Sequence, residues 1–255
     1  MQRRNVLKGL AAVAVLPSFR PAMATPFQRV RPGDPGWPSP QEWEVLKADV
    51  GGSLTAVEPL FGACHSDPQG RSCGGTEQNI HNPFFIGDQA AGTQTSGWLD
   101  AWMSAPSVYA VKARHAADVA AAVNLARTHN LRLAVKGGGH SYQGTSNAAD
   151  SLLIWTRAMN DVSLHQRFVG AGCEGKIDPQ PAVSAGAGVM WVDLYHAVTS
   201  EAGRYVQGGA CTSVGVPCCA NKKARFWSRR SSPAAASRPS GCISTRAWRE
   251  HRPKR

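Results

Sequence analysis

Residues 107–136 constrain the fold more than any other part of the chain. Residues 107–113 alternate in polarity as a β-strand does, and residues 116–130 repeat apolar side chains at helical spacing. Residues 131–136 form a second apolar run of strand length. This order, with its short connections, predicts a β-α-β unit whose two strands run parallel.

The second expected strand leads straight into Gly137, Gly138, Gly139 and His140. Because glycine has no Cβ, this backbone reaches positive φ and lets its N–H groups approach a ligand closely. Successive N–H groups of this kind suit an anion such as pyrophosphate, and ligands often bind beyond strand ends. Spacing alone leaves a plain flexible turn open, because neither G-x-G-x-x-G nor a P-loop lysine is present. We call residues 137–146 the first glycine loop.

Residues 208–216, GGACTSVGV, form a second glycine loop around Cys211. Cys211 paired with His140 could describe a hydrolase, but no orienting acid or nucleophile motif accompanies them. The plainer interpretations are a structural half-cystine and a histidine satisfied by ordinary hydrogen bonds. No partner ligands occur near His140 at zinc spacing, so we expect no metal site.

The remaining pattern is less regular. A helix is expected from Pro40, with Ser39 as its cap. Residues 60–100 have a loop-like character, residues 151–156 predict a strand, and residues 181–202 predict a strand, a glycine turn and a helix from about Trp191. A strand end is expected near Val206.

Four stretches together resemble the FAD-binding domain of the vanillyl-alcohol-oxidase and p-cresol-methylhydroxylase (PCMH) superfamily. They are VKGGGHSYQGTS, SLLIWTRAMNDVSL, VSAGAGVMWVDLYHAV and RYVQGGACTSVGV, in that order. Within the superfamily they are most similar to the berberine-bridge-enzyme-like oxidases. The resemblance covers residues 105–216, with weaker similarity back to about residue 80. It implies an α+β fold, namely a partial PCMH-type FAD-binding domain with mixed sheets and flanking helices.

The resemblance also implies roles for single residues. His140 matches the histidine that bonds covalently to the flavin, and Cys211 matches the cysteine that adds a second bond in doubly linked members. A neutral imidazole and a thiolate are suitable nucleophiles for such bonds. The other implied FAD-binding residues are Gly137, Gly138, Gly139, Ser141, Tyr142, Gly144, Thr145, Ser146, Thr212, Ser213, Val214 and Gly215.

The implied activity is that of an oxidase. Hydride would pass from an alcohol or carbohydrate substrate to FAD, and the electrons would then pass to molecular oxygen. The resemblance ends at Val216, so no catalytic base or substrate-binding residue is assigned. Residues 217–255 change abruptly to a composition rich in Arg, Ser, Pro and Ala, which predicts disorder. We expect a truncated or frameshifted member of the family with little activity.

The net charge of +11 does not indicate a nucleic-acid-binding domain. Residues 218–255 contain eleven Lys and Arg but one acidic residue, so +10 of that charge lies in the tail. The alternative function is a non-catalytic exported protein whose tail binds nucleic acid or anionic surfaces through aromatic and arginine side chains. Export argues against nucleic acid as a partner, so we expect no nucleic-acid binding.

The N-terminus has the three parts of an export signal. Arg3 and Arg4 precede an apolar stretch over residues 6–16, and Ala22-Met23-Ala24 is a small-residue cleavage site. The paired arginines predict a twin-arginine signal over residues 1–24. The stretch is too short to span a bilayer, so we expect a periplasmic or secreted bacterial protein; an uncleaved anchor is the alternative.

The expected compartment determines how the seven cysteines can be interpreted. An oxidising compartment permits disulfides, and Cys64 and Cys73 flank a turn-rich segment that their pairing would close. The odd number leaves at least one thiol without a partner in the chain. The expected organisation is a signal at 1–24, an N-terminal segment at 25–104, the partial domain at 105–216 and the tail at 217–255.

Overall fold

The computed structural model describes residues 28–94, 105–206 and 208–216 of the 255-residue chain. The signal peptide and the basic tail predicted from the sequence lie outside the described residues. The elements are α1 (Pro40–Asp49), β1 (Leu54–Ala56), α2 (Gly62–Ser66), α3 (Arg71–Asn79), α4 (Pro83–Gly87), β2 (Tyr109–Lys112), α5 (Ala116–Thr128), β3 (Arg132–Lys136), β4 (Ser151–Trp155), the 3-10 turn η1 (Thr156–Ala158), β5 (Val162–Phe168), β6 (Gln180–Ala185), α6 (Trp191–Tyr195) and the π-helical turn η2 (His196–Glu201).

A four-stranded sheet with the order β1-β2-β4-β3 carries the first half of the fold. β2, β4 and β3 are parallel, whereas β1 pairs antiparallel with β2. The predicted β-α-β unit is therefore confirmed as β2-α5-β3, with β4 inserted between its two strands. All five residues of β4 are buried, as expected for a central strand covered on both faces.

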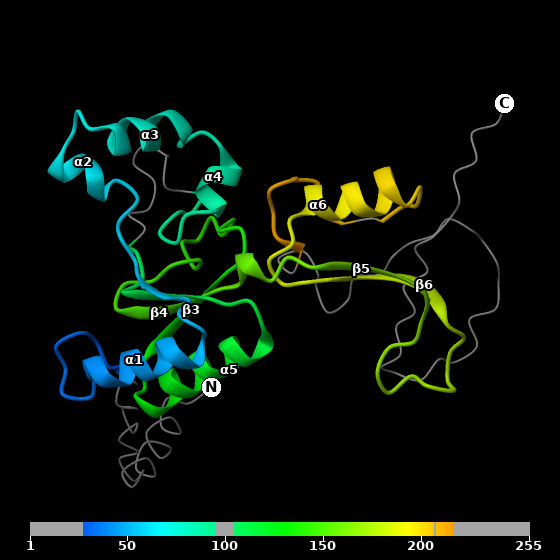
Figure 1. The fold of residues 1–255 in the computed structure, drawn as a ribbon, viewed down its shortest axis with the longest axis horizontal. Helices are drawn as coiled ribbons and strands as arrows, with labels where there is room; N and C mark the ends of the chain where they lie inside the picture. The colour runs from blue at the N-terminus through cyan, green and yellow to red at the C-terminus, as the bar shows by residue number, and fades with distance from the viewer. Residues whose placement is uncertain (1–27, 95–104, 207, 217–255) are drawn as a thin grey trace, which may run out of the picture.

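Helices cover both faces of this sheet (Figure 1). α1 and α5 lie on one face, and α2, α3 and α4 lie on the other. The main core fills the first interface with Trp43, Leu46, Val50, Leu54, Val111, Ala113, Ala122, Ala126, Leu131, Leu152 and Ile154. Alternate residues of the same strands face the other way, where Ala110, Ala134, Leu153 and Trp155 form a smaller core.

The β5–β6 hairpin extends away from the sheet, and α6 with η2 lies along it (Figure 1). A separate core joins these elements through Val189, Trp191, Leu194, Val198, Val206 and Val214. The helix expected from Trp191 is confirmed, although its second half is π-helical. The strand expected near Val206 is wrong: the described residues 203–206 and 208–216 form no strand and have an isolated bridge between Gly215 and Met190. The sequence patterns did not predict β5.

The helix at Pro40 is confirmed together with its cap. Ser39 and Glu42 form a reciprocal capping box, and Pro40 occupies the first helical position, where its missing N–H costs nothing.

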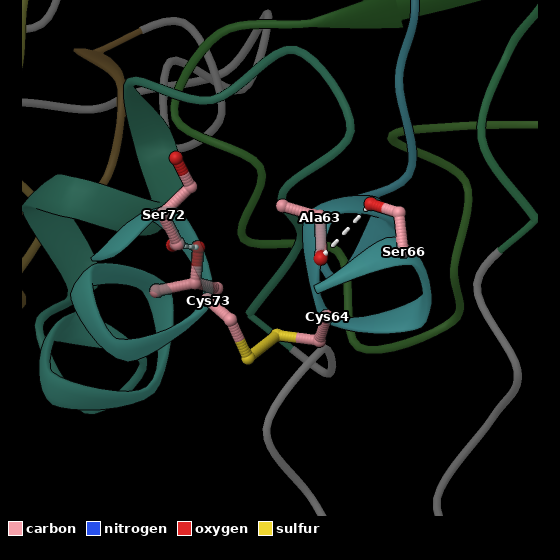
Figure 2. The surroundings of a disulfide bond; sticks show 6 residues. Ala63, Cys64, Ser66, Ser72 and Cys73 are labelled. Carbon is pink, nitrogen blue, oxygen red and sulfur yellow. Dashed lines mark hydrogen bonds between the residues drawn. A yellow bond between two sulfur atoms is a disulfide. The ribbon is translucent and has the colours of Figure 1, made fainter. Parts of the chain in front are cut away.

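The loop-like character expected for residues 60–100 is wrong for α2, α3 and α4; residues 95–100 lie outside the described residues. α2 buries no residue and α3 buries only Cys73, so neither carries the apolar period of a helix packed on a core. A disulfide between Cys64 and Cys73 joins the two helices, as predicted (Figure 2). Among the helices that the structure describes, none combines the length and the apolar character needed to cross a membrane.

Candidate functional site

The first glycine loop begins where β3 ends at Lys136. Gly139 has a φ of +76° and Gly144 a φ of +71°, values that favour glycine. A Cβ on Gly138 would lie 2.8 Å from the carbonyl oxygen of Ser213, which is too close for any side chain. The bare backbone therefore lets the two glycine loops touch.

Four consecutive amides of this loop are free. Within the described residues, the backbone N–H groups of Gly138, Gly139, His140 and Ser141 have no acceptor. Gly138 and Gly139 are buried, and buried N–H groups without a partner are rare. Consecutive amides that are free next to a left-handed residue form an anion-binding nest. The donor set thus fits the pyrophosphate of a dinucleotide cofactor such as FAD.

The second glycine loop is held in place by the start of α6. The backbone N–H groups of Trp191 and Val192 donate to the carbonyls of Val214 and Thr212, both at 3.0 Å. The first N–H groups of a helix have no partner inside it, so these loop carbonyls satisfy them. The side chain of Val214 is buried in the hairpin core.

His140 and Cys211 meet at one hydroxyl. His140 Nε2 lies 2.9 Å from Ser213 Oγ, and Ser213 Oγ lies 3.5 Å from Cys211 Sγ. Ser213 is fully buried, whereas Cys211 is an exposed free thiol. Burial lowers the pKa of His140, and hydrogen bonding to Ser213 opposes this shift. The imidazole is thus kept neutral near pH 7, with a lone pair available for a nucleophilic role.

The rest of the first glycine loop closes on itself. Ser141 Oγ and Thr145 Oγ1 are 2.6 Å apart, and the Thr145 backbone N–H donates to Ser141 Oγ. Tyr142 is exposed, while Ser146 is buried. The structure therefore brings together the glycines, His140, Ser213 and Cys211. Ser141 and Thr145 serve the shape of the loop, with their hydroxyls already bonded to each other.

Sequence reasoning missed two buried polar residues beside this loop, Lys136 and Asn147. Lys136 is 1% exposed and Asn147 is 3% exposed. Burial lowers the pKa of Lys136 to about 7, against the attraction of the Asp88 carboxylate. The available signal was a lysine that ends an apolar strand directly before three glycines.

Comparison with known proteins identifies this architecture. The protein family described as "FAD binding domain" matches residues 107–217. Residues 107–217 are an FAD-binding domain of the vanillyl-alcohol-oxidase (VAO)/PCMH superfamily. The domain thus contains both glycine loops and the hairpin between them.

The relatives include proteins named as flavoprotein or FAD-linked enzymes. The chain is 32% identical over 204 residues to the bifunctional decalin synthase calF of Penicillium decumbens, a match that covers 74% of this chain and 34% of the relative. It is 28% identical over 209 residues to the VAO-type flavoprotein oxidase VAO615 of Thermothelomyces thermophilus, covering 75% of this chain and 35% of that one.

The fold also matches a solved structure. The crystal structure of the VAO-type flavoprotein MtVAO615 from Myceliophthora thermophila C1 aligns with a TM-score of 0.62 at 26% identity, covering 73% of this chain and 36% of that one. The chain spans about a third of the length of the relatives it matches.

Proposed function

We propose that this domain binds FAD as part of an oxidoreductase that oxidises an alcohol or a carbohydrate and passes the electrons to molecular oxygen. Bound FAD supplies the hydride acceptor, while the protein supplies its orientation and electrostatic surroundings. The observation that carries the proposal is the run of four free amides that lies against Ser213 of the second glycine loop. The amides would hold the pyrophosphate, and the imidazole of His140 belongs to the same run of residues.

We further propose that His140 and Cys211 are covalent attachment sites for the flavin. Support comes from the neutral imidazole and the exposed thiol, which share Ser213 as a common neighbour. Each bond would form with loss of one hydrogen from the residue and one from the cofactor. The two protons and two electrons released would reduce molecular oxygen to hydrogen peroxide.

We also propose export to an oxidising compartment. The Cys64–Cys73 disulfide supports this proposal, because such bonds persist outside the reducing cytosol. Covalent attachment would suit that setting, since it prevents loss of the cofactor by dilution.

Acid precipitation of the FAD-loaded protein tests the two attachment sites. We expect the wild-type precipitate to stay yellow. Each single variant, His140→Ala or Cys211→Ala, should lose one linkage. The double variant should lose all colour. His165→Ala is the matched control, because His165 forms a similar 2.9 Å bond with Ser184 on the hairpin. A colourless wild-type precipitate contradicts covalent attachment.

Equilibrium dialysis and a peroxide assay test the remaining parts separately. Failure of the wild-type chain to retain FAD in dialysis contradicts the cofactor proposal itself. Peroxide formation with a panel of alcohols and sugars tests the oxidase activity. The same assay on the His140→Ala and Cys211→Ala variants shows whether this activity depends on the flavin bonds.

A further inference from the structure

Two buried side chains flank the first glycine loop. Lys136 immediately precedes Gly137, and Asn147 immediately follows Ser146. Both are almost completely buried, although polar side chains are usually exposed unless they are fully paired. Their bonding partners therefore show what these residues hold together.

Lys136 binds the turn formed by residues 89–92. Its Nζ donates to the carbonyl oxygens of Gln89, Ala90 and Gly92, at 2.8 Å for Ala90 and 3.1 Å for Gly92. These three acceptors match the three protons of an ammonium group. Nζ also lies 4.9 Å from the centre of the Trp155 ring, a favourable cation–π position.

Asn147 binds the same turn from the other end of the loop. Its Nδ2 donates to the carbonyl oxygens of Ala90 at 3.1 Å and Ala91 at 3.2 Å. Its Oδ1 accepts from the backbone N–H and the hydroxyl of Ser107, which precedes β2. The carbonyl of Ala90 thus accepts from both Lys136 and Asn147.

Held in this way, the 89–92 turn lies directly against Gly139 of the first glycine loop. The carbonyl oxygen of Gly92 would be 3.1 Å from a Cβ on Gly139, and the Gln94 backbone N–H donates to the Gly139 carbonyl at 3.0 Å. The carbonyls of the turn accept from Lys136 or Asn147, and in the described residues none of them accepts from the four free amides. The turn therefore supports the loop without occupying its donors.

We propose that Lys136 and Asn147 are positioning residues that fasten both ends of the first glycine loop to the 89–92 turn and so hold its amides open for the FAD pyrophosphate. The inference rests on the proposed FAD function. It extends the cofactor site to a turn that precedes residue 107, where the family match begins. The amides of residues 138–141 have no acceptor among the described residues, so this part of the loop gains its order from such flanking contacts, and this order lowers the entropy lost on binding.

The test compares FAD with riboflavin, which lacks the pyrophosphate. Dissociation constants are measured at pH 6, where Lys136 is an ammonium, by quenching of flavin fluorescence. Every chain compared is full-length and carries His140→Ala and Cys211→Ala, so that the proposed flavin bonds cannot form. Lys136→Met and Asn147→Ala should each weaken FAD binding at least tenfold, the effect of losing a buried hydrogen-bonded group, and leave riboflavin binding unchanged. Lys112→Met is the matched control, since Lys112 is exposed and lies 5.1 Å from the same Trp155 ring.

The double variant sharpens the test. Because both side chains bind Ala90, the combined loss should be smaller than the product of the two single losses. Equal weakening of FAD and riboflavin, or wild-type FAD affinity in Lys136→Met, overturns the proposal. If Lys136→Met does not fold, the uncharged Asn147→Ala variant carries the same comparison.

Amide hydrogen exchange of the cofactor-free protein separates this proposal from the FAD function. Both variants should raise exchange in residues 89–94 and 137–146 together, while Lys112→Met should not. If the variants show this joint rise in exchange but the wild-type chain binds no FAD, the proposed FAD function is contradicted. The proposal that Lys136 and Asn147 fasten the loop to the turn would then still stand. Faster exchange confined to one of the two segments overturns the fastening itself.

Discussion

The two glycine loops have similar compositions but are held in different ways. The first is fastened by the side chains of Lys136 and Asn147, which reach a turn more than forty residues earlier in the chain. The second is fastened by its own backbone carbonyls, which accept from the first N–H groups of α6. The amides of residues 138–141 in the first loop therefore have no acceptor among the described residues, whereas the carbonyls of Thr212 and Val214 in the second are already bonded.

The difference shows which loop can serve an anion. An anion needs donors, and a loop keeps its donors free only when other groups provide its order. Backbone bonding of the second loop instead positions Ser213 against His140. Substitutions of side chains should therefore change the free energy of unfolding more in the first loop than in the second, except where the two loops touch.

The largest expected effect is at that contact. Gly138→Ala would place a Cβ 2.8 Å from the Ser213 carbonyl oxygen and 3.4 Å from the Gly215 nitrogen, both of them backbone atoms. We expect a loss of about 1–3 kcal/mol in the free energy of unfolding, typical of overpacking. Urea denaturation followed by circular dichroism measures it.

The neighbouring Gly137→Ala is the control for this change. Its nearest contact would be an ordinary 3.4 Å to the Ala187 carbonyl oxygen, and its φ is not positive. We expect little or no loss there. Similar losses at both glycines would show that the contact between the loops is not tight.

A pair of threonines compares the two loops directly. Thr145 Oγ1 bonds Ser141 at 2.6 Å, so Thr145→Ala should cost about 0.5–1 kcal/mol of unfolding free energy. Thr212 is exposed and acts through its carbonyl, so Thr212→Ala should stay within about 0.5 kcal/mol of wild type. The same denaturation experiment measures both, and a larger loss at Thr212 would contradict backbone fastening of the second loop.

The smallest expected effect is a pH dependence from His140. Burial lowers its pKa below the ordinary value of 6.5, so the unfolded chain takes up the proton first as the pH falls. The free energy of unfolding should therefore decrease below pH 6.5, by a fraction of a kcal/mol because the ring is only half-buried. Denaturation midpoints at pH 7.5 and 5.5 measure this decrease.

His140→Asn should remove that decrease, and His165→Asn on the hairpin should leave it in place. The opposite assignment, with the pH dependence lost only in the His165 variant, would mean that His140 is as hydrated in the folded chain as in the unfolded one.

Sequence patterns predicted the local parts of this fold well. The β-α-β unit, the capped helix at Pro40 and the disulfide each depend on residues close together in the chain, and all are confirmed. The helices between residues 62 and 87 were missed because they bury few apolar side chains. β5 was missed because its side chains are mostly exposed, which weakens the alternation that marks a strand.

The sequence by itself determined the glycines, the histidine and the cysteine, since bare backbone and nucleophilic side chains are properties of single residues. Only the tertiary structure decided that β4 separates the two strands of the β-α-β unit and that Ser213 lies between His140 and Cys211. It alone also showed that Lys136 and Asn147 share the carbonyl of Ala90. Hydrophobic periodicity reports which face of an element is buried, whereas the partner of a buried polar group depends on which distant segment packs there.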